Sequence, residues 1–140
     1  IHIDPAIIQN AGNAVCKKVY RLFKERNIPA RVMPAGLRGV HHLTSMAGAD
    51  MTFSLQARIQ RMVIEAAPEQ KCHIDEEISP AIIQELYKLP EFVRAYEEGA
   101  LKPEEFITFG VTQKTMSQFL WTGWVPLETY QTDQDSGRWF

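Results

Sequence analysis

The sequence predicts an α/β protein in which short buried strands alternate with helices. Between residues 4 and 67, three amphipathic segments alternate with two short apolar runs, and the links between them are only a few residues long. Alternation with short links is typical of parallel strands. No strand is predicted after residue 53, so the rest of the chain is predicted to be helical.

The first helix is expected to begin at Asp4-Pro5, because aspartate caps free N–H groups and proline suits the first helical position. It should end near Arg26, because Pro29 cannot continue a helix. Its apolar residues recur at helical spacing and predict the buried face: Ile8, Ala11, Val15, Val19 and Leu22.

Two strands are predicted at 31–33 and 49–53, because both runs are short and apolar. Between them, a short helix is expected to begin near Val40 and to stop at Gly48. Ser54 follows the second strand and is expected to cap a third helix that reaches Ala66.

The second half changes character at a polar, proline-containing linker over residues 67–77. Helices are expected at 80–87, 91–98 and 112–120, with a short helical turn from Pro103. The tail over 124–140 mixes aromatic and polar residues, which must be packed or form an interaction surface. We therefore predict two parts, 1–67 and 68–140.

Composition excludes several classes of protein. The net charge of −2, with both signs interspersed, argues against a nucleic-acid surface. The two cysteines have no CxxC spacing, which favours a reducing, cytoplasmic setting without structural zinc. No run of about 18 apolar residues is present, so no membrane span is predicted.

Arg38 is the best candidate for chemistry. It follows the first predicted strand, where α/β proteins bind ligands, and a guanidinium there can clamp a phosphate or carboxylate. Gly36 would let the backbone approach such a ligand, and Ser54 could touch it from the next strand. The alternative, in which Arg38 is a surface residue paired with a neighbouring acid, is about as well supported by the residues alone.

No catalytic residue and no metal site is predicted. His41 and His42 are adjacent, and adjacent helical side chains diverge instead of sharing a metal. A Schiff-base lysine must be desolvated to become a nucleophile. All the lysines are instead expected on helix surfaces or in loops: Lys17, Lys18, Lys24, Lys71, Lys88, Lys102 and Lys114.

The stretch from Asp4 to Ser54 resembles the last βα units of transaldolase and related class I sugar-phosphate aldolases. The matching motifs are Val32-Met33-Pro34-Ala35-Gly36-Leu37-Arg38, then Leu43 to Ala47 with Gly48-Ala49-Asp50, then Met51-Thr52-Phe53-Ser54. They follow a helix that reads Val-Cys-Lys-Lys-Val-Tyr-Arg-Leu-Phe-Lys. The later helices look like the C-terminal extension of some family members.

The resemblance implies the C-terminal fragment of a (β/α)₈ TIM barrel, with about two of its parallel strands, followed by an all-helical extension. It implies transfer of a three-carbon dihydroxyacetone unit between sugar phosphates in the pentose phosphate pathway. The reaction uses a lysine Schiff base and no cofactor, and the family's reactive lysine has no counterpart here. Arg38 matches the family's phosphate-binding arginine, whereas Gly36 replaces a phosphate-binding serine.

Because the chain opens on Ile1-His2-Ile3 without Met, we expect a piece of a longer protein. Two strands cannot close a barrel, so the piece is expected to be inactive alone. It should self-associate or pair with the missing N-terminal part of the barrel. The alternatives are a sugar-phosphate aldolase relative and a non-enzymatic helical interaction module that uses the aromatic tail.

Overall fold

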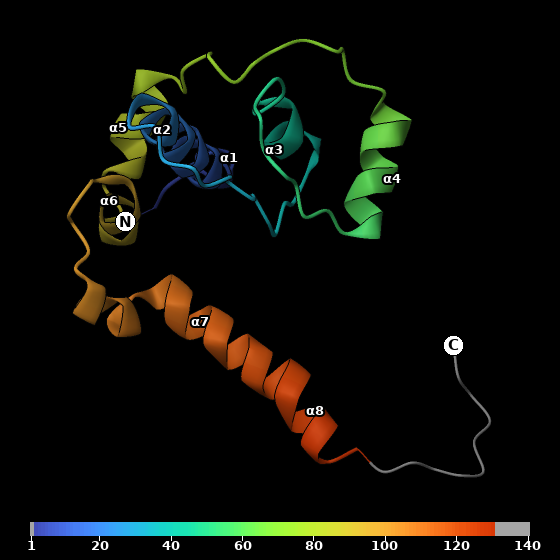
Figure 1. Cartoon of the computed structure of the whole chain (residues 1–140), viewed down its shortest axis with the longest axis vertical. Helices are drawn as coiled ribbons and strands as arrows, with labels where there is room; N and C mark the ends of the chain where they lie inside the picture. Colours follow the sequence, from blue (N-terminus) through green and yellow to red (C-terminus); the bar gives the residue numbers. More distant parts are fainter. Residues whose placement is uncertain (1, 131–140) are drawn as a thin grey trace. The chain divides into compact units, whose positions relative to one another are not determined.

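The computed structural model describes residues 2–130, and within them the chain is helical. It divides after Ala100 into two compact units, each of which is described by itself. The first unit holds α1 (Pro5–Ile8), α2 (Ala11–Glu25), α3 (Val40–Thr44), α4 (Ala57–Ala66), α5 (Pro80–Leu86) and α6 (Pro90–Tyr96). Figure 1 shows α1 and α2, in blue, beside α5 and α6, in yellow.

The predicted helix start at Asp4-Pro5 is confirmed. Asp4 Oδ1 accepts a hydrogen bond of 2.8 Å from the Ala6 N–H, and Pro5 occupies the first helical position. The expected single helix is nevertheless broken into α1 and α2 at residues 9–10. At this break the Asn10 side chain donates a hydrogen bond of 2.9 Å to the Ala6 carbonyl oxygen, which competes with the helical backbone.

Helix α2 separates two apolar clusters. On one side Ala14 packs with Leu86 of α5 and Phe92 of α6. On the other side Tyr20 packs with Met46 and Ile74. Helices from both sides of the predicted 67/68 boundary therefore share one unit.

The prediction of an α/β fold with two parallel strands is wrong, because residues 2–130 contain no strand. Two hydrogen bonds join the predicted strand segments, from the Thr52 N–H to the Val32 carbonyl oxygen at 3.2 Å and from the Ser54 N–H to the Pro34 carbonyl oxygen at 2.9 Å. A parallel ladder needs a return bond between them, from the N–H of residue 34 to the Thr52 carbonyl. Pro34 has no N–H, so the ladder cannot form.

The capping role expected for Ser54 is also wrong. Helix α4 begins at Ala57, and its N-cap is Gln56 without a side-chain hydrogen bond. The helix ends as predicted near Ala66, where Ala67 adopts a left-handed conformation with φ of 41° directly before Pro68.

The second unit is a 3₁₀ helix, η1 (Pro103–Thr108), followed by a continuous helical run of α7 (Gly110–Gln118), a π-helical turn η2 (Phe119–Trp124) and α8 (Val125–Glu128). The predicted aromatic tail is therefore helical as far as Glu128, and its residues 131–140 lie outside the described residues. Many large apolar side chains of this run are exposed, among them Phe119, Trp121 and Trp124. No helix within residues 2–130 is long and apolar enough to cross a membrane.

Candidate functional site

Arg38 lies in the connection between Leu37, which is buried, and the start of α3. Its side chain is exposed and forms no ion pair within residues 2–130. Its backbone is held in place, since the Arg38 N–H donates to Nδ1 of His42 at 3.2 Å. The structure thus holds the backbone of the predicted anion-binding residue in place and leaves its guanidinium without a partner among residues 2–130.

His42 links Arg38 to the end of α1. Its Nε2 lies 3.0 Å from the Gln9 carbonyl oxygen, which can only accept a hydrogen bond. Nε2 therefore carries the proton, and Nδ1 is the acceptor for the Arg38 N–H. This arrangement requires the neutral ring, and it gives His42 a structural role that the sequence did not indicate.

His41 lies against His42, with ring centroids 4.0 Å apart and an angle of 37° between the rings. Burial and the neighbouring His42 ring lower the pKa of His41. The two rings contact each other side by side on a short helix.

Gly36 and Ser54, like Arg38, come shortly after the ends of the two hydrogen-bonded segments that were predicted to be strands. The φ of Gly36 is +68°, in the left-handed region that suits glycine, although nothing lies within 4 Å of a Cβ added there. The hydrogen bond from the Ser54 N–H to the Pro34 carbonyl brings Ser54 beside the segment that leads to Arg38. The backbone therefore places all three predicted site residues in one region.

The polar residue that sequence reasoning missed most clearly is Lys17. It is buried, with 4% of its surface exposed, so the prediction that every lysine is solvated is wrong at this position. Its Nζ donates hydrogen bonds to the carbonyl oxygens of His73 at 2.7 Å and Glu76 at 2.6 Å. Burial lowers the pKa of this ammonium, while the nearby Glu76 carboxylate acts in the opposite direction.

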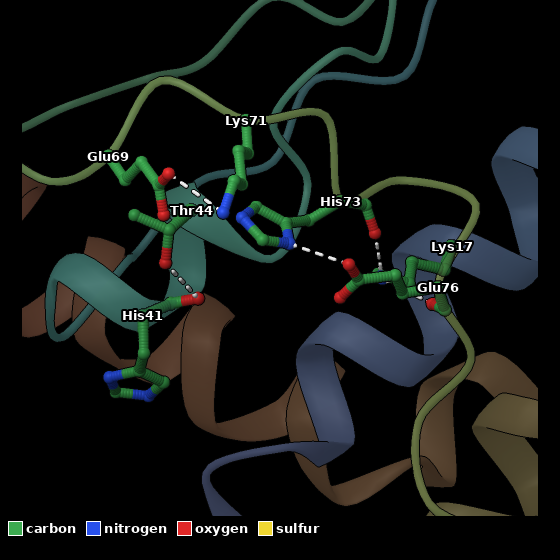
Figure 2. Close-up of polar contacts among 7 residues, drawn as sticks. All are labelled: Lys17, His41, Thr44, Glu69, Lys71, His73 and Glu76. Carbon is green, nitrogen blue, oxygen red and sulfur yellow. Dashed lines mark hydrogen bonds and ion pairs between the residues drawn. The ribbon is translucent and has the colours of Figure 1, made fainter.

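Figure 2 shows Lys17 reaching from α2 to the loop that carries His73 and Glu76. In this loop His73 Nδ1 lies 3.0 Å from Oε1 of Glu76. The loop is tied to the end of α3 as well, because the N–H groups of His73 and Ile74 both donate to the Ala47 carbonyl oxygen. The Lys17 ammonium and the Ala47 carbonyl oxygen thus hold the 73–76 loop in place, and both residues are distant from that loop in the sequence.

The buried face of α2 differs from the predicted one. The buried residues of the helix are Asn13, Ala14, Lys17 and Tyr20, whereas Val15, Val19 and Leu22 are only partly buried. The sequence did contain a pattern that indicates this face, because residues 14, 17 and 20 recur every three positions and lie on neighbouring parts of the helix surface. The apolar residues Ala14 and Tyr20 flank Lys17 in that row, and this places its stem in the core.

Among residues 2–130 there is no group of three or more histidine, cysteine, aspartate or glutamate residues that could hold a metal ion. No family model, curated protein or solved structure matches the chain. The function of the chain must therefore be inferred from its own residues and from the resemblance of their motifs.

Proposed function

We propose that the chain is the phosphate-binding portion of a transaldolase, an enzyme of carbohydrate metabolism in the cytoplasm. In this proposal Arg38 binds the phosphate of a sugar phosphate, and Gly36 and Ser54 border the same site. The Schiff-base lysine that carries the three-carbon dihydroxyacetone unit belongs to another part of the enzyme.

The observation that carries the proposal is the free guanidinium of Arg38. Several other arginines of the first unit are engaged by carboxylates, for example Arg21 at 3.2 Å from Glu77 and Arg26 at 2.6 Å from Glu98. Arg58 and Arg61 also have no ion pair within residues 2–130, but neither lies at the matching motif. Arg38 has no such partner among the described residues, although its backbone is fixed by His42. An unpaired arginine on a fixed backbone is well suited to bidentate binding of phosphate.

Titration of the labelled chain with fructose 6-phosphate, followed by NMR of the arginine Nε–Hε groups, tests this site. We expect the Arg38 signal to shift and saturate, and Arg38→Ala to weaken binding by tenfold or more, as loss of a charged hydrogen bond predicts. Arg58→Ala is the matched control, because Arg58 is also exposed and without an ion pair within residues 2–130. Equal losses in both variants would show general attraction of anions and contradict a site at Arg38.

Borohydride trapping with a ketose phosphate tests the second part of the proposal. Lys17 is desolvated, as a Schiff-base lysine must be, but its Nζ is directed at two backbone carbonyls. We expect no covalent adduct with the isolated chain. A trapped adduct at any lysine, found by peptide mass spectrometry, would show that this chain carries its own nucleophile.

A helical interaction module is the second candidate, and the second unit favours it. Residues 110–130 contain only two charged residues, Lys114 and Glu128, and the large apolar side chains among them are exposed. The expected partner of such a surface is a second copy of the chain. Light scattering should then show a dimer or larger assembly for the whole chain and a monomer for residues 1–100, with no change in Arg38→Ala.

A further inference from the structure

A small pocket lies between α2, α3 and the loop that follows α4. Its volume is about 240 Å³, and most of the residues that line it have polar side chains, among them Asn13, Lys17, His41, Thr44, Ser45 and Glu76. Apolar atoms of these side chains also contribute much of the lining surface. Figure 2 shows His41 and Thr44 on α3, with Lys17 and Glu76 on the other elements that border the pocket. Arg38 does not line it, so a ligand in this pocket is independent of a phosphate site at Arg38.

Asn13 is the most informative residue of this pocket. Only 2% of its surface is exposed, yet its side-chain amide has no hydrogen-bond partner within residues 2–130. Among the described residues, every side-chain polar atom that is fully enclosed has a hydrogen-bond partner. The unpartnered Asn13 amide is therefore not fully enclosed, and it reaches solvent through the pocket that it lines. Because the amide reaches solvent through this pocket, its unused donor and acceptor can pair only with water or with a ligand that occupies the pocket.

The other polar groups of the pocket also retain capacity. The Thr44 hydroxyl lies 3.5 Å from the His41 carbonyl oxygen and the Ser45 hydroxyl lies 3.4 Å from that of His42. Both distances exceed the usual O–H···O range of about 2.5–3.0 Å, so these hydroxyls are weakly engaged. Lys17 uses two of its three N–H groups on backbone carbonyls.

Both carboxylates at the pocket have a partner. The Glu76 carboxylate pairs with His73, and the neighbouring Glu77 carboxylate pairs with Arg21 at 3.2 Å. Lys17 lines the same pocket, and its ammonium is already bonded to the carbonyl oxygens of His73 and Glu76. An anion would meet two carboxylates at this pocket, whereas a neutral ligand would meet a mixture of donors and acceptors.

We propose that this pocket binds a small, neutral, polyhydroxylated ligand, a polyol or a sugar, whose hydroxyls pair with the Asn13 amide. A hydroxyl both donates and accepts hydrogen bonds, as the amide does, and therefore satisfies both of its unused functions. The pocket is smaller than the roughly 300–1,000 Å³ of sites for drug-sized ligands, so the ligand is small.

Titration of the ¹⁵N-labelled full chain with glycerol, erythritol and D-ribose tests the proposal, with inorganic phosphate as the comparison. We expect at least one of the polyhydroxylated compounds to shift the side-chain NH₂ signals of Asn13 in a saturable way, and phosphate to leave them unchanged. If none of the three compounds shifts these signals, or if phosphate alone does, the proposal is wrong.

Asn13→Leu separates a ligand-binding role from a structural one. Because the amide has no partner among the described residues, replacing it with an apolar side chain of similar size should leave Tm unchanged or raise it. Binding, followed at the backbone amides of Thr44 and Ser45, should weaken by at least tenfold. A marked fall in Tm, or ribose binding equal to that of the unaltered chain, would overturn the assignment.

Thr44→Val supplies a second variant that removes one hydroxyl and keeps the shape of the side chain. It should weaken binding of the same compound severalfold without loss of the folded state. Gln113→Leu, which removes an exposed amide in the second unit, is the control and should change neither binding nor Tm.

Discussion

Lys17 and Glu76, which are 59 residues apart in the sequence, are joined by a hydrogen bond of 2.6 Å from the Lys17 Nζ to the Glu76 carbonyl oxygen. The same ammonium donates to the His73 carbonyl oxygen, so a single side chain of α2 closes the 73–76 loop onto the helix. In the folded chain these two bonds from the Lys17 ammonium replace hydrogen bonds to water. A hydrogen bond with a charged donor is stronger than one between neutral groups.

Lys17→Met should therefore destabilise the first unit by about 2–3 kcal/mol, because two carbonyl oxygens lose their charged partner. The free energy of unfolding is measured by urea titration, and hydrogen exchange of residues 73–77 should become faster. Lys24→Met is the control, since Lys24 is exposed and lies 5.0 Å from the Tyr20 ring centroid. Equal effects of the two substitutions would contradict a special role for Lys17.

Pro34→Ala tests why the two predicted strands fail to form a ladder. The substitution supplies the missing N–H, which can donate to the Thr52 carbonyl between the two bonds already present. We expect the new amide of residue 34 to be protected from hydrogen exchange. Pro29→Ala is the control. Residue 29 does not lie between two hydrogen bonds that join neighbouring segments, so its new amide should exchange freely with solvent. An unprotected amide at residue 34 would show that another cause keeps the segments apart.

The fold was predictable where local rules decide it. The helix starts at Pro5 and Pro80 follow from proline at the first helical position, and both are confirmed. The prediction of two strands was wrong because a short apolar run is found in strands and also in irregular extended segments. Here Pro34 lacks the N–H that the parallel ladder needs at its position, so the segments stay irregular.

The candidate site was predictable in part. Arg38 could be singled out from its place after an apolar run, but its support by His42 and Gln9 depends on contacts between distant residues. The row of residues 14, 17 and 20 indicates which face of α2 is buried, but the burial of Lys17 and Asn13 comes from packing of α2 against α3 and the 73–78 loop, which are distant in the sequence. Polar residues at such positions are expected at the surface until the partners are known.

Gly48 and Gly36 provide a matched pair for measuring backbone strain. Both have positive φ, of 89° and 68°, but a Cβ added at Gly48 would lie 2.2 Å from Cys72 Sγ, whereas one at Gly36 meets nothing within 4 Å. Gly36→Ala should cost about 1–2 kcal/mol through strain alone, and Gly48→Ala should cost more. Urea unfolding of both variants gives the two values.

The double variant Gly48→Ala with Cys72→Ala separates steric overlap from strain. Removal of Sγ takes away the closest contact, while Cβ and Cα of residue 72 remain 3.1 and 3.3 Å from the added Cβ. The double variant should therefore recover most of the loss due to overlap and still cost somewhat more than Gly36→Ala. If Cys72→Ala recovers nothing, the contact with the thiol has no energetic effect, and the cost at Gly48 comes from its backbone conformation and from the remaining contacts with Cβ and Cα of residue 72.

The hydrogen bond between Tyr87 and Glu97 leads us to expect a loss of stability at alkaline pH. The Tyr87 hydroxyl donates a hydrogen bond to Oε1 of Glu97, and this bond raises the pKa of Tyr87 to about 12. The unfolded chain releases the tyrosine proton near the usual pKa of about 10, so between these two values the folded state holds more protons. Stability that is present below about pH 10 is therefore lost as the pH rises toward about 12.

Tyr87→Phe should remove this part of the pH dependence, because it leaves the aromatic contacts with Phe92 and Tyr96 and takes away only the hydroxyl. It should also weaken the acid dependence, since the same hydrogen bond is the main cause that lowers the pKa of Glu97. Urea unfolding below and above the usual tyrosine pKa measures the alkaline effect, and unfolding through the acid range in which carboxyl groups titrate measures the acid effect. Tyr130→Phe, at an exposed tyrosine of the second unit, is the control. An alkaline slope that survives in Tyr87→Phe would assign the loss to other groups.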